Sequence, residues 1–396
     1  MQFRKKYSSL LLTSVLLVLC GCVEPFDAET ETFESVVVIE ATLTNEITNQ
    51  QVKLSRASRL EDEGPIAESN AKVSIIDDSQ NEYIFNETEP GIYVSTNEFA
   101  ARPSVSYQLF VITADSRSYV SRPAQLQVQN FYEIENLYAN KTDENETGEE
   151  GISVFIDNTS SETNAKYYRY EYEETYKVIA PFWTSNDLVE MPQNSGQLVF
   201  VPKEKESQTC YRTEKSNRII LANTNAFSEN RLTRFPIRFI EKASYIPANR
   251  YSILVKQFVL SREAYTFYET LRDFSGSESL FSENQPGFFN GNIVSETNAN
   301  EKVIGFFDVS AISEKRIFFE YRDFFTEGPL PDFVNDCLFD APPSISLVDI
   351  IRTGNVRYFS DNTNPQPIKK PYLVVPDICG DCTVFGSNIV PDFWEE

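Results

Sequence analysis

Histidine is absent from the sequence of 396 residues. This absence excludes a Ser-His-Asp triad, a zinc ion held by imidazoles and acid–base catalysis by imidazole. Carboxylate pairs or a Ser-Lys dyad would still permit catalysis, but no motif marks either arrangement. We therefore expect a protein that is not an enzyme and that needs neither a metal nor another cofactor.

Cations are also few: 35 Lys and Arg stand against 59 Asp and Glu, which gives a formal net charge of −24. This balance argues against binding to nucleic acid or to anionic lipid surfaces. Glycine is scarce at 14 residues, whereas phenylalanine and tyrosine are abundant at 30 and 20. Aromatic and β-branched runs between polar turns predict strands.

Long apolar runs are missing, apart from one short stretch near the N-terminus. Positive charge at residues 4–6 precedes an apolar run at residues 10–19, which is too short to span a bilayer permanently. Leu-Cys-Gly-Cys follows at residues 19–22, with leucine at −3 and glycine at −1 relative to Cys22. This pattern is typical of bacterial lipoproteins, and Cys20 fits it worse because a bulky leucine precedes it. The alternative is an ordinary secretory peptide with a cysteine nearby by chance.

We therefore predict a signal peptide at residues 1–21 and a lipid-modified, palmitate-carrying Cys22. Several buried acyl chains hold a protein firmly on a membrane. The acidic residues that follow predict a flexible tether over residues 22–33.

Four further cysteines remain, and an even number in an exported chain indicates two disulfides. They are Cys210, Cys337, Cys379 and Cys382. Three pairings are possible, and we expect Cys337 to join one member of the Cys379–Cys382 pair, because a ring within that pair would constrain little chain. A four-cysteine zinc site is the alternative, but the spacing is irregular and contains one CxxC motif.

Short strands with turn signals between them fill residues 34–125. Val52 and Leu54, for example, alternate with Lys53 and Ser55, and a Pro-Gly turn follows at residues 90–91. About seven strands at this spacing predict an immunoglobulin-like β-sandwich.

Residues 126–396 predict a second β-rich domain with one packed helix near residues 261–274. Ser261 is a suitable N-cap. Apolar residues then recur at helical spacing and would pack on the sheet; they are Ala264, Phe267, Tyr268, Leu271 and Phe274. The segment from Phe324 to the end is rich in proline and aspartate, so we expect an extended tail held by the disulfides.

Two patterns allow a ligand as well as a structural interpretation. Tyr168, Tyr170 and Tyr172 share one face of a strand. Such a row is typical of a core face, although it can also stack on sugar rings. Residues 141–150 are dense in oxygen ligands for calcium, but the EF-hand spacing is absent, which favours a solvated loop.

Aromatic residues in predicted loops are candidates for contacts with a partner protein. They are Phe182, Trp183, Phe288 and Phe289. Each can equally be an ordinary member of the core.

Short motifs along most of the chain carry a family resemblance. They include residues 210–213 (CYRT), 260–267 (LSREAYTF) and 379–382 (CGDC), followed by PDFW at residues 391–394. In this order they resemble an uncharacterised family, a domain of unknown function, among outer-membrane lipoproteins of Bacteroidota. Genes of that family commonly lie beside SusC-like TonB-dependent receptors.

The resemblance implies a lipoprotein on the extracellular face of the outer membrane, in a SusCD-like transport complex. It would act as a lid or substrate-capture partner of a SusC-like TonB-dependent barrel. The chain differs from SusD proteins, which are dominated by paired helices. The alternative is a structural surface subunit of a larger outer-membrane assembly, for barrel insertion or secretion, without a small ligand.

Overall fold

The computed structural model describes residues 36–57, 64–127, 133–143, 148–159, 165–225, 231–275, 291–364 and 368–396. The predicted signal peptide, the tether at residues 22–33 and Cys22 lie outside the described residues. Phe288 and Phe289, two of the candidate partner contacts, also lie outside them.

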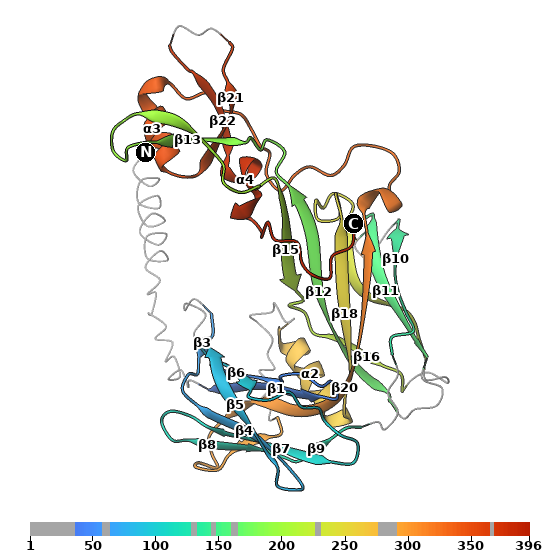
Figure 1. The fold of residues 1–396 in the computed structure, drawn as a ribbon. Coiled ribbons are helices and arrows are strands. Elements are labelled where there is room, and N and C mark those ends of the chain that lie inside the picture. Colours follow the sequence, from blue (N-terminus) through green and yellow to red (C-terminus); the bar gives the residue numbers. More distant parts are fainter. Residues whose placement is uncertain are drawn as a thin grey trace, which may run out of the picture.

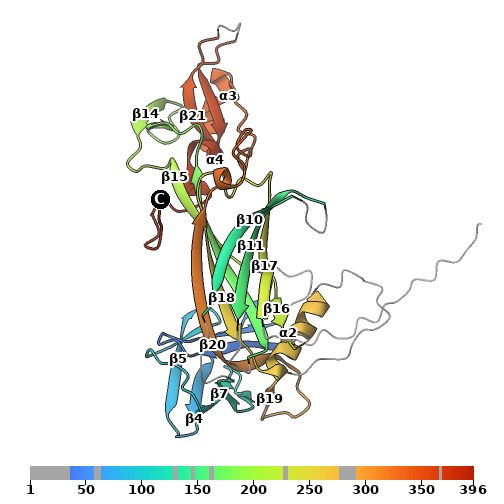
Figure 2. The same ribbon diagram turned by 90° about the vertical axis from the view of Figure 1, so that its right-hand side faces the viewer.

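Three units follow one another along the molecule (Figures 1 and 2). An N-terminal sandwich lies at one end and a central sandwich in the middle. The other end is a small unit of residues 181–207 and 336–384, which we call the distal unit. The chain is mainly β, and the predicted β-rich fold with a packed helix is confirmed.

The N-terminal sandwich is one path of hydrogen-bonded strands that surrounds a single core. On β1, alternate residues from Val37 to Leu43 face inward, as the pleat of a half-buried strand requires. Its strands are β1 (Val37–Thr44), β2 (Gln51–Arg56), β3 (Ile66–Ala67), β4 (Lys72–Asp77), β5 (Glu82–Glu89), β6 (Ile92–Ser95), β7 (Ser106–Ile112), β8 (Ser118–Ser121), β9 (Ala124–Gln125), β19 (Ile293–Ser295) and the first part of β20 (Val303–Phe319).

The predicted turn before β6 depends on Gly91. Its φ of +76° is a backbone conformation that residues with a Cβ rarely adopt. A Cβ at this position would also lie 2.5 Å from the carbonyl oxygen of Leu54. Glycine therefore allows the turn to pass close to β2.

Strand β20 joins the two sandwiches. Its first part pairs in parallel with β1, from Val303 to Ser310, and its second part pairs antiparallel with β18 (Tyr251–Val259). Strand β19 also pairs with β8. Strand pairing thus crosses the boundary that we predicted at residue 125.

The central sandwich consists of two facing sheets. One contains β15 (Thr209–Lys215), β16 (Ile220–Asn223), β12 (Tyr167–Ile179), β18 and the second part of β20. The other contains β10 (Asn136–Thr142), β11 (Gly151–Thr159) and β17 (Arg231–Glu241). A short 3₁₀ helix, η1 (Tyr321–Asp323), follows β20.

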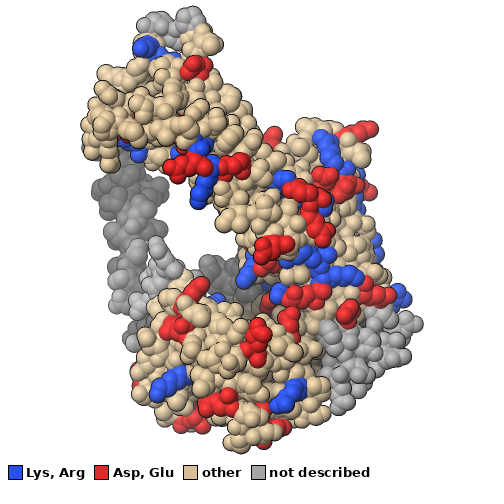
Figure 3. Space-filling view, in the orientation of Figure 1, with Lys and Arg blue, Asp and Glu red and all other residues tan. Residues whose placement is uncertain are grey.

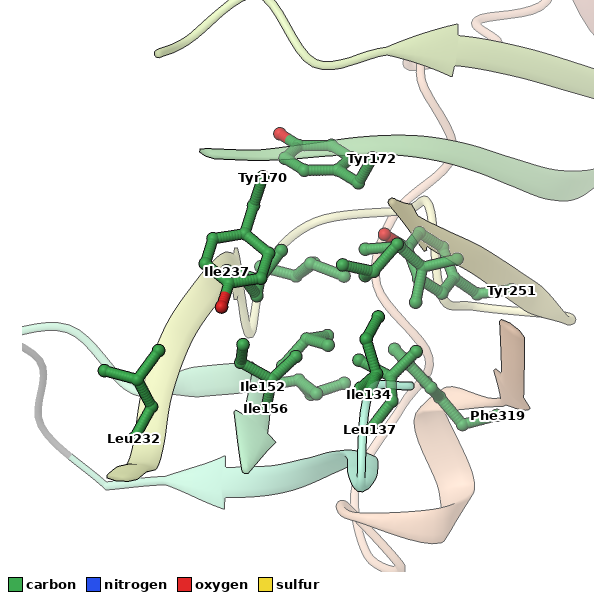
Figure 4. Close-up of a cluster of buried hydrophobic side chains, with 14 of the residues drawn as sticks. Ile134, Leu137, Ile152, Ile156, Tyr170, Tyr172, Leu232, Ile237, Tyr251 and Phe319 are labelled. Carbon is green, nitrogen blue, oxygen red and sulfur yellow. The ribbon is translucent and has the colours of Figure 1, made fainter. Parts of the chain in front are cut away.

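The tyrosine row of β12 lies in the core between these sheets (Figure 4). Tyr168, Tyr170 and Tyr172 are 2%, 0% and 7% exposed. The Tyr170 ring lies 5.5 Å from that of Phe235, and its hydroxyl donates to Gln257 Oε1 at 3.0 Å. The structural interpretation of the row is therefore confirmed, because these rings are not available to a sugar.

An ion pair between a half-buried arginine and a buried carboxylate connects the two sheets. Arg238 of β17 donates to both carboxylate oxygens of Glu174 on β12, at 3.1 and 3.2 Å. The hydroxyl of Tyr251 donates to the same carboxylate at 2.6 Å. Glu174 is 5% exposed, so its charge depends on these two partners.

Helix α2 (Arg262–Ser275) packs against the sheet near the junction of the sandwiches, as predicted. The Ser261 hydroxyl accepts from the N–H of Ala264 at 3.0 Å, which is the expected N-cap. The ring of Phe267 lies 5.4 Å from that of Phe306 on β20. Within the described residues, no helix combines the length and apolar character that a membrane span needs.

The distal unit contains more regular structure than we predicted. The expectation of an extended tail is wrong, because α3 and a hairpin form within it. Helix α3 has nine residues, too few for a clear period, and it packs through Leu347 against Val374 of the hairpin. The elements of the unit are β13 (Asn186–Glu190), β14 (Leu198–Pro202), α3 (Ser344–Arg352), β21 (Val356–Asp361), β22 (Tyr372–Pro376), α4 (Asp377–Gly380) and η2 (Cys382–Val384).

The C-terminal residues leave the distal unit and return to the central sandwich (Figure 1). The ring of Trp394 lies 4.9 Å from that of Tyr211 on β15. Lys177 of β12 pairs with Glu396 at 2.8 Å. The end of the chain thus covers part of the outer face of the central sheet.

Candidate functional site

Two disulfides hold the distal unit together and attach it to the central sandwich. Cys210 of β15 is bonded to Cys382 of η2, and Cys337 is bonded to Cys379 of α4. The expectation of two disulfides among these four residues is confirmed, and Cys337 joins one member of the CxxC pair. The distal unit is therefore crosslinked internally and to the central sandwich.

Phe182 packs inside the distal unit. Its ring lies 4.6 Å from that of Phe339 and 5.1 Å from that of Phe359. Its N–H donates to the carbonyl of Cys379 at 2.9 Å. The side chain is half-buried, and a contact with a partner stays a prediction.

Trp183 is also half-buried, and it packs against the Cys210–Cys382 disulfide. Its indole N–H donates to the hydroxyl of Ser207 at 3.1 Å. The ammonium of Lys203 lies 5.5 Å from the ring centre. The structure thus brings both described aromatic candidates into one unit, where they support its interior.

The surface of the distal unit exposes many large apolar side chains. Eight of the sixteen such side chains among the described residues belong to this unit, which is about a fifth of the chain. They are Met191, Val199, Phe200, Leu338, Phe339, Ile345, Ile368 and Val384. On the face in Figure 3 the unit is largely uncharged, whereas charged side chains are spread over the sandwiches. This concentration of exposed apolar side chains in one small unit favours an interaction site there.

An ion pair fixes the β13–β14 hairpin to α3. Arg352 donates to both carboxylate oxygens of Glu190, at 2.6 and 2.7 Å, and the N–H of Gly196 donates at 2.6 Å. Hydrogen bonding from Arg352 lowers the pKa of Glu190 to about 2. The carboxylate therefore stays charged at neutral pH and holds the hairpin in place.

A second candidate site is a cavity of about 810 Å³ beside α2. Charges of both signs and two phenylalanine rings line it, among them Arg122, Arg262, Glu263, Phe267, Phe306 and Asp308. Asp308 is 2% exposed, and burial raises the pKa of its carboxyl to about 6. Such a lining can hold a small polar ligand. In the described part of the chain, no group of three or more Cys, Asp or Glu residues is placed to bind a metal.

Sequence reasoning missed the exposed aliphatic residues of the distal unit. A signal was available, because β14 is an uncharged run, Leu-Val-Phe-Val-Pro, in a strongly acidic protein. Exposure itself could not be predicted, since the same run would also fit a buried strand.

These observations define a β-rich protein of two sandwiches with a disulfide-braced distal unit. The chain belongs to the family described as "Domain of unknown function (DUF4249)", whose profile matches residues 23–316. The match contains β13 and β14 and ends before α3. No curated protein matches the chain.

Solved structures offer distant likenesses. A trypsin-activated alpha-2-macroglobulin from Escherichia coli is 9% identical over 58% of this chain and 15% of that chain, with a TM-score of 0.16. An alpha-2-macroglobulin mutant from Salmonella is 9% identical over 57% of this chain and 14% of that chain, with the same TM-score. This chain thus spans about one seventh of those proteins, and likenesses at this level carry no argument about fold or function.

Proposed function

We propose that this protein is a lipid-anchored subunit on the extracellular face of the outer membrane. It docks on a SusC-like TonB-dependent barrel and acts as the lid or the substrate-capture partner of that transporter. The Leu-Cys-Gly-Cys pattern at residues 19–22 supports the anchor, and the acidic tether after it would let the folded body reach a neighbour. The resemblance to Bacteroidota lipoproteins supports the choice of barrel.

The observation that carries the proposal is the apolar surface of the distal unit. Protein interfaces bury an apolar core with a polar rim, and a stable one needs more than about 1,000 Å². The disulfides and the Glu190–Arg352 pair hold this surface in shape before binding, which lowers the entropic cost of association. The cavity beside α2 offers space for a small cargo in the substrate-capture role.

The test is affinity purification from outer membranes solubilised under mild conditions, with mass spectrometry of what copurifies. Protease treatment of intact cells runs in parallel. We expect a TonB-dependent barrel in the eluate and cleavage of the protein on whole cells. Recovery of the protein alone, protected from protease, would refute both the partner and the orientation. A barrel-insertion or secretion complex in the eluate would favour a structural subunit instead.

A further inference from the structure

Strand β14 forms an open edge of the distal unit. The N–H of Met191 donates to the carbonyl of Gln197 at 3.0 Å, and this register continues along the β13–β14 hairpin. In an antiparallel pair, hydrogen-bonded positions alternate with positions whose backbone groups face the other way. Leu198, Phe200 and Pro202 are at the latter positions, so their backbone groups point away from β13.

Among the described residues, no strand lies beside these outward backbone groups, because β14 pairs with β13 alone. The N–H groups of Leu198 and Phe200 and the adjacent carbonyls form an unused half of a strand ladder. Pro202, which has no N–H, occupies an outward position, as proline does in edge strands. Figure 2 shows β14 at the side of the distal unit away from α3.

The side chains of β14 make this edge apolar. Phe200 is 46% exposed even though its ring lies 4.8 Å from that of Tyr358 and 5.5 Å from that of Tyr372. Val199, on the opposite face, is 36% exposed. The strand contains no charged residue.

Two longer edge strands, β15 and β17, carry arginines that discourage pairing, namely Arg212 and Arg234. The edge strands β16, β19 and β22 are uncharged, as β14 is. Natural proteins protect their sheet edges with such charges, and an uncharged apolar edge readily pairs with another chain. At β14 the uncharged edge also exposes Val199 and Phe200, which points to a strand that is covered when the protein is assembled.

We propose that β14 is a site of β-strand addition, where an extended segment of the partner adds a third strand to the β13–β14 sheet. The inference rests on the proposed function for the identity of the partner, which we take to be the barrel protein. The segment would have apolar residues at alternate positions, covering the rings of Phe200, Tyr358 and Tyr372. Main-chain hydrogen bonds would supply affinity and the rings selectivity.

Two variants of one residue separate the backbone from the side chain. Phe200→Ala removes the ring but keeps the outward N–H, whereas Phe200→Pro removes both and leaves the bonds to β13 in place. We expect Phe200→Pro to bind the purified barrel about tenfold more weakly than Phe200→Ala, because proline cannot donate the main-chain hydrogen bond to the added strand. A tenfold change in the dissociation constant corresponds to about 1.4 kcal/mol of binding free energy. Circular dichroism and thermal melting establish that both variants fold. Equal affinities of the two folded variants would overturn strand addition.

Photo-crosslinking in the assembled complex locates the contact. A benzophenone amino acid replaces Val199 in the full-length protein, and the control carries it at Ile47 of the N-terminal sandwich, which is 76% exposed. We expect a crosslink to the barrel from position 199 and none from position 47. A crosslink from 199 to a second copy of this chain, or none at all, would overturn the inference while copurification of the barrel still supported the proposed function. If the wild-type protein recovers no barrel, both fail.

Discussion

Removing the Cys337–Cys379 disulfide should loosen the distal unit and leave the sandwiches folded. The bond closes a loop of 42 residues, for which the chain-entropy treatment gives about 4 kcal/mol. The distal unit has small cores, one around Leu188, Leu347 and Val374, which cannot replace that contribution. The variant is Cys337→Ser with Cys379→Ser, so that no free thiol remains to exchange with the other disulfide.

Hydrogen exchange followed by mass spectrometry measures the effect for each element, because local opening has its own free energy. We expect exchange in β13, β14, β21 and β22 to accelerate by up to roughly a thousandfold, which corresponds to about 4 kcal/mol. Exchange in β12 and β18 should not change. Unchanged exchange in the distal strands would refute the bracing role. Equal acceleration in all strands would refute the distal unit as a separate unit of stability.

Three further predictions concern the rest of the chain. Arg238→Ala should lower the free energy of unfolding, measured by urea denaturation, by about 3 kcal/mol, because it leaves the Glu174 carboxylate buried without its cation. The double variant Arg238→Leu, Glu174→Gln should lose less unfolding free energy, because no unpaired charge remains. Because the pKa of Asp308 is about 6 in the folded state and 3.8 ordinarily, the free energy of unfolding should fall by about 2 kcal/mol between pH 4 and pH 6 relative to Asp308→Asn, and parallel pH profiles would contradict this. Cys22→Ala should abolish palmitate labelling and release the protein from the membrane fraction. If Cys22→Ala is still labelled and Cys20→Ala is not, the lipid is on Cys20 and the assignment to Cys22 is wrong.

Local patterns predicted much of the two sandwiches. The alternation of Val52 and Leu54 with polar residues matches β2, and the Ser261 cap with the apolar period matches α2. These signals depend on the faces of single elements, which the sequence contains. The parallel pairing of β1 with β20 could not be predicted in this way, because it joins segments more than 250 residues apart.

The distal unit was predicted least well, for a physical reason. Its elements are short and come from two distant parts of the chain, so no single stretch has a clear period. Helix α3 directly follows Pro342 and Pro343, so the sequence there predicts an extended segment and not a helix. Strand β14 is short and is followed by a charged loop. The cysteines were the informative residues in this unit. Their even number predicts disulfides, whereas the residues between them show no clear period.

The most direct test of the account compares two matched surface variants in binding to the purified barrel. Leu338 of the distal unit and Ile47 of the N-terminal sandwich are 74% and 76% exposed, so replacing either by glutamate should leave the fold intact. The dissociation constant of each variant is measured by surface plasmon resonance in detergent. The account predicts that Leu338→Glu weakens binding at least about tenfold, or about 1.4 kcal/mol, while Ile47→Glu binds like the wild type. Equal affinities of the two variants, or a loss confined to Ile47→Glu, would contradict the distal unit as the docking surface.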